Sequence, residues 1–108
     1  MEHLEYMEEL SMHLLELLEE GLGLQPKSIS RHYNRQESPS VLKFSHYPVC
    51  HRPDLVQGFP PHTDASTMAI LHQEVPGLQV LKDGEWLSIR PEPGSLIVNI
   101  GDTLQVLS

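Results

Sequence analysis

Proline and glycine interrupt the second part of the chain so often that they limit what it can fold into. From residue 41 onward, the longest stretch without either residue is 62–75. Proline cannot donate the backbone hydrogen bond that a helix interior or a central strand needs, and glycine favours turns. Residues 41–108 are therefore expected to form short strands, turns and loops.

Apolar runs between these turns indicate where the strands lie. Residues 78–81 and 85–89 flank Asp83-Gly84, a dipeptide typical of a two-residue β-hairpin turn. Gly101-Asp102 is expected to form a further turn. The other predicted strands are 41–47, 67–73, 95–100 and a last one that begins over 104–107. This pattern favours a mainly β fold, a sandwich or barrel backed by a helix.

The first twenty residues predict that helix. They hold seven of the fifteen acidic residues, Glu19 among them, and no Lys or Arg, which we interpret as a solvated helix face. Gly21 and Gly23 are expected to end the helix, and a short helical turn over 27–34 and a linker to residue 40 follow. The apolar residues recur at three- and four-residue steps and form one stripe: Leu4, Met7, Leu10, Leu14, Leu17 and Leu18.

Composition excludes several classes of function. A chain of 108 residues is expected to form one small domain, and its net charge of −8 argues against nucleic acid as a partner, because an acidic chain repels phosphate. There is no apolar run long enough to cross a membrane and no basic, apolar leader, so neither a span nor a signal peptide is expected. The single cysteine, Cys50, cannot form an internal disulfide, which favours a reducing, cytoplasmic location.

The tripeptide His62-Thr63-Asp64 is the main candidate for chemistry. In an extended segment, residues two apart project from the same face, so His62 and Asp64 would direct a nitrogen and an oxygen to one point. That donor pair suits Fe(II) or Mn(II). By itself, a His-x-Asp tripeptide is weak evidence for a metal site, because it occurs often by chance and more commonly belongs to an ordinary surface turn.

Several motifs in order resemble the plant-type Fe(II)/2-oxoglutarate-dependent dioxygenases, the group that includes gibberellin oxidases and flavonoid oxygenases. The Leu-rich segment ending in Gly21-Leu22-Gly23-Leu24 is similar to the helix that precedes the core of that family. The closer matches lie in residues 47–55, 58–64, 70–73, 77–80, 83–86 and 98–102.

This resemblance implies a partial double-stranded β-helix, or jelly roll, with an N-terminal helical segment and linker at 1–40 and an incomplete oxygenase core at 41–108. It implies that His62 and Asp64 bind Fe(II) and that Tyr47 hydrogen-bonds the cosubstrate 2-oxoglutarate, with ascorbate as a supporting reductant. Ser45 stands where the family has an asparagine, which weakens one secondary contact.

The family's third iron ligand, a histidine, and its 2-oxoglutarate-binding arginine and serine match positions beyond Ser108. The sequence thus predicts a C-terminally truncated oxygenase of a small, largely apolar metabolite, gibberellin- or flavonoid-like. A non-catalytic remnant that binds metal weakly, or that associates through an open sheet edge with itself or a full-length relative, is the alternative. A zinc hydrolase is a third reading, but it would need further ligands in nearby motifs.

Overall fold

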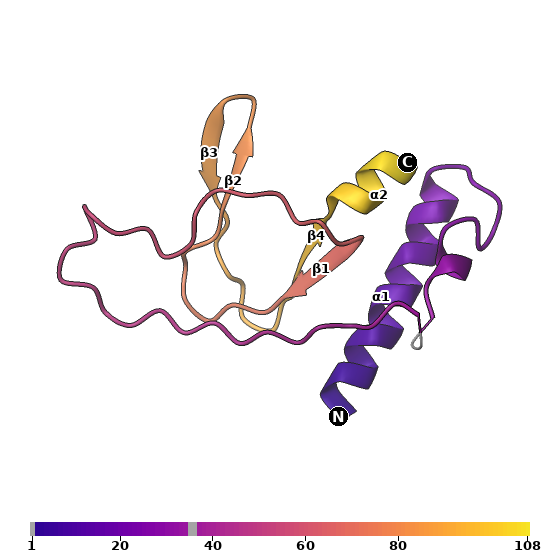
Figure 1. The fold of residues 1–108 in the computed structure, drawn as a ribbon, viewed down its shortest axis with the longest axis horizontal. Helices are drawn as coiled ribbons and strands as arrows, with labels where there is room; N and C mark the ends of the chain where they lie inside the picture. The colour runs from indigo at the N-terminus through magenta and orange to yellow at the C-terminus, as the bar shows by residue number, and fades with distance from the viewer. Residues whose placement is uncertain (1, 35–36) are drawn as a thin grey trace. The chain divides into compact units, whose positions relative to one another are not determined.

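The structure, a computed structural model, describes residues 2–34 and 37–108 (Figure 1). It divides into two compact units: the residues up to Thr63 together with Val106–Ser108, and Asp64–Gln105. The predicted division between residues 40 and 41 rests on sequence and stays a prediction. The elements in chain order are α1 (Glu2–Gly21), η1 (Ser30–His32), β1 (Met68–Leu71), β2 (Gln79–Lys82), β3 (Glu85–Ser88), β4 (Ile97–Ile100) and α2 (Asp102–Leu107).

Helix α1 confirms the predicted N-terminal helix and most of its apolar stripe. Five of the six predicted residues are half-buried, but Leu17 is exposed and was wrongly assigned to the stripe. Leu15, which the prediction omitted, is instead the buried apolar residue of α1. Among the described helices, none is long and apolar enough to cross a bilayer.

The end of α1 is set by a glycine, as predicted. Gly23 has φ of +71°, and its N–H donates to the carbonyl of Glu20 at 3.0 Å. The N–H of Leu24 donates to the carbonyl of Glu19, also at 3.0 Å. This pair of bonds is a Schellman motif, which satisfies the last helix carbonyls and needs a residue that tolerates positive φ.

Glu19 departs from the predicted solvated face, because its side chain is only 2% exposed. Its carboxylate accepts hydrogen bonds from the backbone N–H groups of Lys27 (2.9 Å), Ile29 (2.7 Å) and Ser30, and from the Ser30 hydroxyl. The chain from α1 to η1 is thus folded around one carboxylate, and η1 lies beside α1 (Figure 1). Burial of a charged group is tolerated here because several donors surround it.

The predicted helical turn over 27–34 is confirmed in part by η1, whereas the linker includes residues 35 and 36, which lie outside the described residues.

The strand predicted over 41–47 is wrong, because that segment is irregular, with Val41 and Phe44 each 87% exposed. Alternation alone does not make a strand, which also needs a hydrogen-bonded neighbour. All four described strands belong to Asp64–Gln105.

Within Asp64–Gln105, the strands form two antiparallel pairs, β1 with β4 and β2 with β3 (Figure 1). The predicted hairpin is confirmed: Lys82 pairs with Glu85, and Asp83 and Gly84 have φ of +52° and +82°. Positive φ at both turn residues defines the type I′ turn that Asp-Gly favours.

The strands predicted over 67–73 and 95–100 are confirmed as β1 and β4, with shorter bounds. The N-terminal helix and antiparallel strands agree with the expected β-rich fold, while the partial jelly roll stays a prediction.

The strand predicted to begin over 104–107 is wrong, because Asp102–Leu107 is the helix α2. The N–H of Gln105 donates to the carbonyl of Gly101 at 3.1 Å, and Leu104 is buried. No described strand pairs with this segment, so its backbone groups are satisfied locally by helical hydrogen bonds. Leu104 and Leu107 are three residues apart, a spacing that suits one helix face equally well.

Candidate metal and cosubstrate residues

Asp64 begins a short irregular segment that is tied to the end of β4. The carbonyl of Asp64 accepts a 2.7 Å hydrogen bond from the N–H of Asp102. The next three carbonyls are also engaged: that of Ala65 by the Thr103 hydroxyl (2.8 Å), that of Ser66 by the Thr103 N–H (3.4 Å) and that of Thr67 by the Gly101 N–H (2.9 Å). The backbone that carries the Asp64 side chain is therefore held at four consecutive positions, and the side chain itself is half-buried.

Gly101 makes this close approach of the two segments possible. A Cβ at Gly101 would lie 1.8 Å from the carbonyl oxygen and 2.6 Å from the carbonyl carbon of Ser66. Both atoms belong to the backbone and cannot rotate away. Only glycine therefore fits at this position in the present arrangement of the two segments.

His62 has an orientation that suits a metal ligand. Its Nδ1 lies 2.9 Å from the carbonyl oxygen of Pro60. Because a carbonyl can only accept, Nδ1 must carry the proton, and the lone pair of the neutral imidazole is then on Nε2. Metal-binding histidines are typically fixed in this way, by a backbone carbonyl or carboxylate on the other ring nitrogen.

Phe59 supports the His62 ring from the side. The two ring centroids are 4.7 Å apart, with an edge-to-face angle of 76°. The Lys43 ammonium lies 4.7 Å from the centroid of the same phenyl ring. These contacts are exposed and each is weak, but together they limit the rotation of an imidazole that the Pro60 carbonyl already orients.

Tyr47, the predicted 2-oxoglutarate residue, lies against Gly58. A Cβ at Gly58 would be 3.1 and 3.2 Å from Cδ1 and Cε1 of the tyrosine ring, closer than most real contacts. The tyrosine is 60% exposed, so its hydroxyl can reach a small molecule from solvent. Gly58 thus gives the ring a backbone surface to lie on.

The three predicted site residues do not all fall in one compact unit. Tyr47 and His62 belong to the unit that holds the residues up to Thr63, and Asp64 begins the other. The convergence of His62 and Asp64 on one ion stays a prediction. Over 2–34 and 37–108, no three His, Cys, Asp or Glu side chains form a group that could hold a metal ion. An imidazole whose lone pair is on Nε2 and a carboxylate nevertheless fit Fe(II) in donor type.

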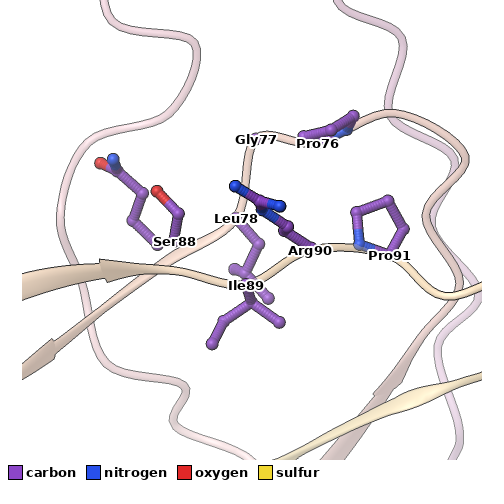
Figure 2. Close-up of a pocket in the computed structure, with 8 residues that line it drawn as sticks. Pro76, Gly77, Leu78, Ser88, Ile89, Arg90 and Pro91 are labelled. Atoms are coloured by element: carbon purple, nitrogen blue, oxygen red, sulfur yellow. The ribbon is translucent and has the colours of Figure 1, made fainter.

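A separate shallow depression lies within Asp64–Gln105. It is formed by the segments that lead into β2 and out of β3, at the open end of the hairpin. The N–H of Ile89 donates to the carbonyl of Leu78 at 2.9 Å, and the Arg90 side chain lies beside the 76–78 segment (Figure 2). None of the predicted site residues lines it. The lining comprises Pro76, Gly77, Leu78, Gln79, Ser88, Ile89, Arg90 and Pro91.

Arg52 forms a surface ion pair, in which its guanidinium group is bound to the carboxylate of Asp54. Its Nε and Nη2 lie 3.0 and 2.8 Å from the two carboxylate oxygens of Asp54. The hydrogen bonds to Asp54 raise the pKa of Arg52, and those from Arg52 lower the pKa of Asp54. The pair is exposed, so it orders the loop locally and contributes little to stability.

Sequence reasoning missed the residues that hold the candidate ligands. Gly101-Asp102 was predicted as a turn within the family match and Pro60 only as part of the matched stretch 58–64, with no supporting role for either, and Thr103 carried no prediction. A glycine directly after an apolar strand does signal a close backbone approach. Nothing in the local sequence says that the approaching backbone is Ser66, which lies 35 positions earlier.

Comparison with known proteins adds an independent finding. Residues 36–108 match the sequence model of the 2OG-Fe(II) oxygenase superfamily. Gibberellin 20 oxidase 2 of Arabidopsis thaliana is 45% identical over 99% of this chain, and leucoanthocyanidin dioxygenase 1 of Oryza sativa subsp. indica is 43% identical over 92%. For 1-aminocyclopropane-1-carboxylate oxidase 5 of Arabidopsis thaliana, the identity is 40% over 99% of the chain.

The chain spans 28% of the length of the first two relatives and 38% of the third. Their names denote enzymes with different substrates, yet the identities are within five percentage points of one another. Overall identity over this stretch therefore does not select one substrate among them.

Proposed function

Because this chain belongs to the 2OG-Fe(II) oxygenase superfamily, we propose that it serves an Fe(II)- and 2-oxoglutarate-dependent oxidation of a small molecule. The region matched to the family, 36–108, includes all three predicted site residues, Tyr47, His62 and Asp64. The observation that carries the proposal is the contact between the Pro60 carbonyl and Nδ1 of His62, which supports Nε2 as the nitrogen that would bind the metal.

Each residue has a distinct role in this proposal. His62 binds Fe(II) through Nε2 and Asp64 binds it through a carboxylate oxygen, and the Tyr47 hydroxyl donates a hydrogen bond to a carboxylate of 2-oxoglutarate. Iron, with 2-oxoglutarate and dioxygen, supplies the oxidising chemistry. The chain orients these donors: the Pro60 carbonyl fixes the imidazole tautomer, and Gly58 lets the Tyr47 ring lie close to the loop.

The proposed substrate is a small, largely apolar molecule of the gibberellin or flavonoid kind. The support comes from the relatives named for a gibberellin and for a leucoanthocyanidin, at 45% and 43% identity. Neither identity separates the two kinds, so turnover of both must be compared directly.

Anaerobic titration of the purified chain with Fe(II) and then 2-oxoglutarate tests the proposal. A chelated 2-oxo acid on Fe(II) gives a metal-to-ligand charge-transfer band in the visible range, which we expect for the unaltered chain. His62→Ala and Asp64→Ala should abolish it, whereas His72→Ala, a change at an exposed histidine outside the motif, should not.

Tyr47→Phe separates the cosubstrate contact from the metal contact. We expect this variant to weaken the affinity for 2-oxoglutarate and to leave the affinity for Mn(II), used as an air-stable probe, unchanged. A chain that binds Mn(II) weakly and gives no band with any cosubstrate concentration would contradict the proposed activity. That result would support the non-catalytic alternative.

A further inference from the structure

We propose that Gly101, Asp102 and Thr103 form a clamp that positions the metal ligand Asp64. The clamp consists of the hydrogen bonds from these three residues to the carbonyls of Asp64, Ala65, Ser66 and Thr67. This inference rests on the proposed function, because it concerns how Asp64 is presented to Fe(II). It assigns a role in metal binding to residues that are not themselves ligands.

Two of the donors of the clamp are backbone groups that would otherwise lack acceptors. The N–H groups of Asp102 and Thr103 lie in the first turn of α2, where no preceding helical carbonyl is available to them. They donate instead to the carbonyls of Asp64 and Ser66. The same bonds thus give the first N–H groups of α2 their acceptors and order the segment that begins at Asp64.

The clamp also continues the β1–β4 ladder. Met68 of β1 pairs with Ile100 of β4, and Gly101 next donates to the carbonyl of Thr67. The register of the two strands therefore extends toward Asp64. Residues 64–67 are irregular, so the hydrogen bonds of the clamp, and not strand alternation, fix the backbone that carries the Asp64 side chain.

Thr103 contributes the only side chain to the clamp. Its hydroxyl donates to the carbonyl of Ala65 at 2.8 Å, across 38 positions of sequence. Groups that orient a metal ligand without touching the metal change metal affinity by about 10- to 100-fold when they are removed. Thr103 acts through the backbone, so we expect an effect at the lower end, about tenfold. It is a positioning residue.

Titration with Mn(II), followed by electron paramagnetic resonance of the unbound ion, tests this role. Thr103→Val keeps the shape of the side chain and removes the donor, and it should weaken Mn(II) binding about tenfold. Thr103→Ser keeps the donor and should bind as the unaltered chain does. Ser95→Ala is the matched control, since it removes a hydroxyl-to-carbonyl bond of 2.7 Å to Glu92 in the same unit, away from the clamp.

A second measurement needs no variant and so does not depend on whether Thr103→Val folds. If the clamp and the metal site are coupled, saturating Mn(II) must increase the protection of the clamp from hydrogen exchange, because linkage is reciprocal. In the unaltered chain we expect slower exchange at residues 101–103 on addition of Mn(II). The β2–β3 hairpin, residues 79–88, serves as the internal control and should not change.

The outcomes separate the inference from the proposed function. Mn(II) binding that Thr103→Val leaves unchanged, or exchange at 101–103 that does not respond to Mn(II), would overturn the positioning role alone. An unaltered chain that fails to bind Mn(II) would overturn the proposed function, and the metal-positioning role with it.

Discussion

The carboxylate of Glu19 accepts a 2.7 Å hydrogen bond from the backbone N–H of Ile29, ten residues further along the chain. Ile29 is itself buried, at 5% exposure, and the N–H of Ser30 donates to the same carboxylate oxygen. One acidic side chain on α1 therefore determines how the next segment folds back. The other half of this junction is the Schellman motif, in which the main chain of Glu19 accepts from Leu24.

The junction at Glu19 should weaken in acid. Burial raises the pKa of Glu19, but the hydrogen bonds from Ser30, Ile29 and Lys27 outweigh that effect and leave the pKa below its ordinary value. A lowered pKa stabilises the fold at pH above the unfolded value of about 4.3, and this stabilisation is lost as pH falls through the folded pKa. The amide chemical shifts of Ile29 and Ser30, followed by NMR from pH 6 downward, should report the loss.

Glu19→Gln provides the control for this pH dependence. We expect the variant to be less stable than the unaltered chain at neutral pH and to show no such loss in acid. Glu20→Gln changes the neighbouring exposed acid and should retain both the stability and the transition. A transition that persists in Glu19→Gln would assign the pH dependence to another group.

Gly23→Ala should destabilise the chain by about 1 kcal/mol. The cause is the backbone alone, because φ is +71° and no atom lies within 4 Å of the added Cβ. Gly23→Asn should cost less, since asparagine tolerates this conformation better. Urea unfolding measures the difference. Gly77→Ala, at a position with ordinary φ and equally open space, should have a smaller effect.

Gly101→Ala should be far more damaging, with a loss of about 3 kcal/mol or more. Its Cβ would lie 1.8 Å from the Ser66 carbonyl oxygen, so the two backbone segments must separate. Gly84→Ala is a useful comparison, because φ there is +82° but the space is open. In thermal unfolding followed by circular dichroism, the midpoint of Gly101→Ala should be well below that of Gly84→Ala. Equal midpoints would show that the Ser66 contact does not exist in solution.

Gly58→Ala should weaken cosubstrate binding without weakening metal binding. The added methyl would lie 3.1 Å from the Tyr47 ring, which must move by a few tenths of an ångström. We expect a loss of 2-oxoglutarate affinity smaller than that of Tyr47→Phe, with Mn(II) affinity unchanged. Parallel calorimetric titrations would measure both. A parallel fall in the two affinities would indicate that Gly58 supports the whole loop.

Features determined by a few neighbouring residues could be predicted from sequence. Asp83-Gly84 predicts the hairpin because the conformation of a two-residue turn depends on those two residues. The end of α1 at Gly23 is local in the same sense. The candidate ligands were found by motif, and the structure adds the tautomer of His62 through Pro60.

Features that depend on distant partners could not be predicted. The segment 104–107 has a pattern compatible with strand or helix, and only the absence of a strand partner among the described residues decides for α2. Glu19 lies in the same acidic, Leu-rich stretch as the exposed acids beside it, so nothing in its neighbours distinguishes it. Its burial depends on donors eight to eleven residues away. Thr103 is separated from Ala65 by 38 positions.

The hairpin β2–β3 lies between β1 and β4 in the chain, and this order has a consequence for folding. The hairpin closes across two residues, whereas pairing of Leu71 with Ile97 must bring together two residues that are 26 positions apart in the chain. Local closure is faster, and a formed hairpin shortens the loop that remains to be closed. We therefore expect the hairpin to be an early structure and the segment of Asp64 to become ordered late, so that competence to bind metal is acquired among the last steps of folding.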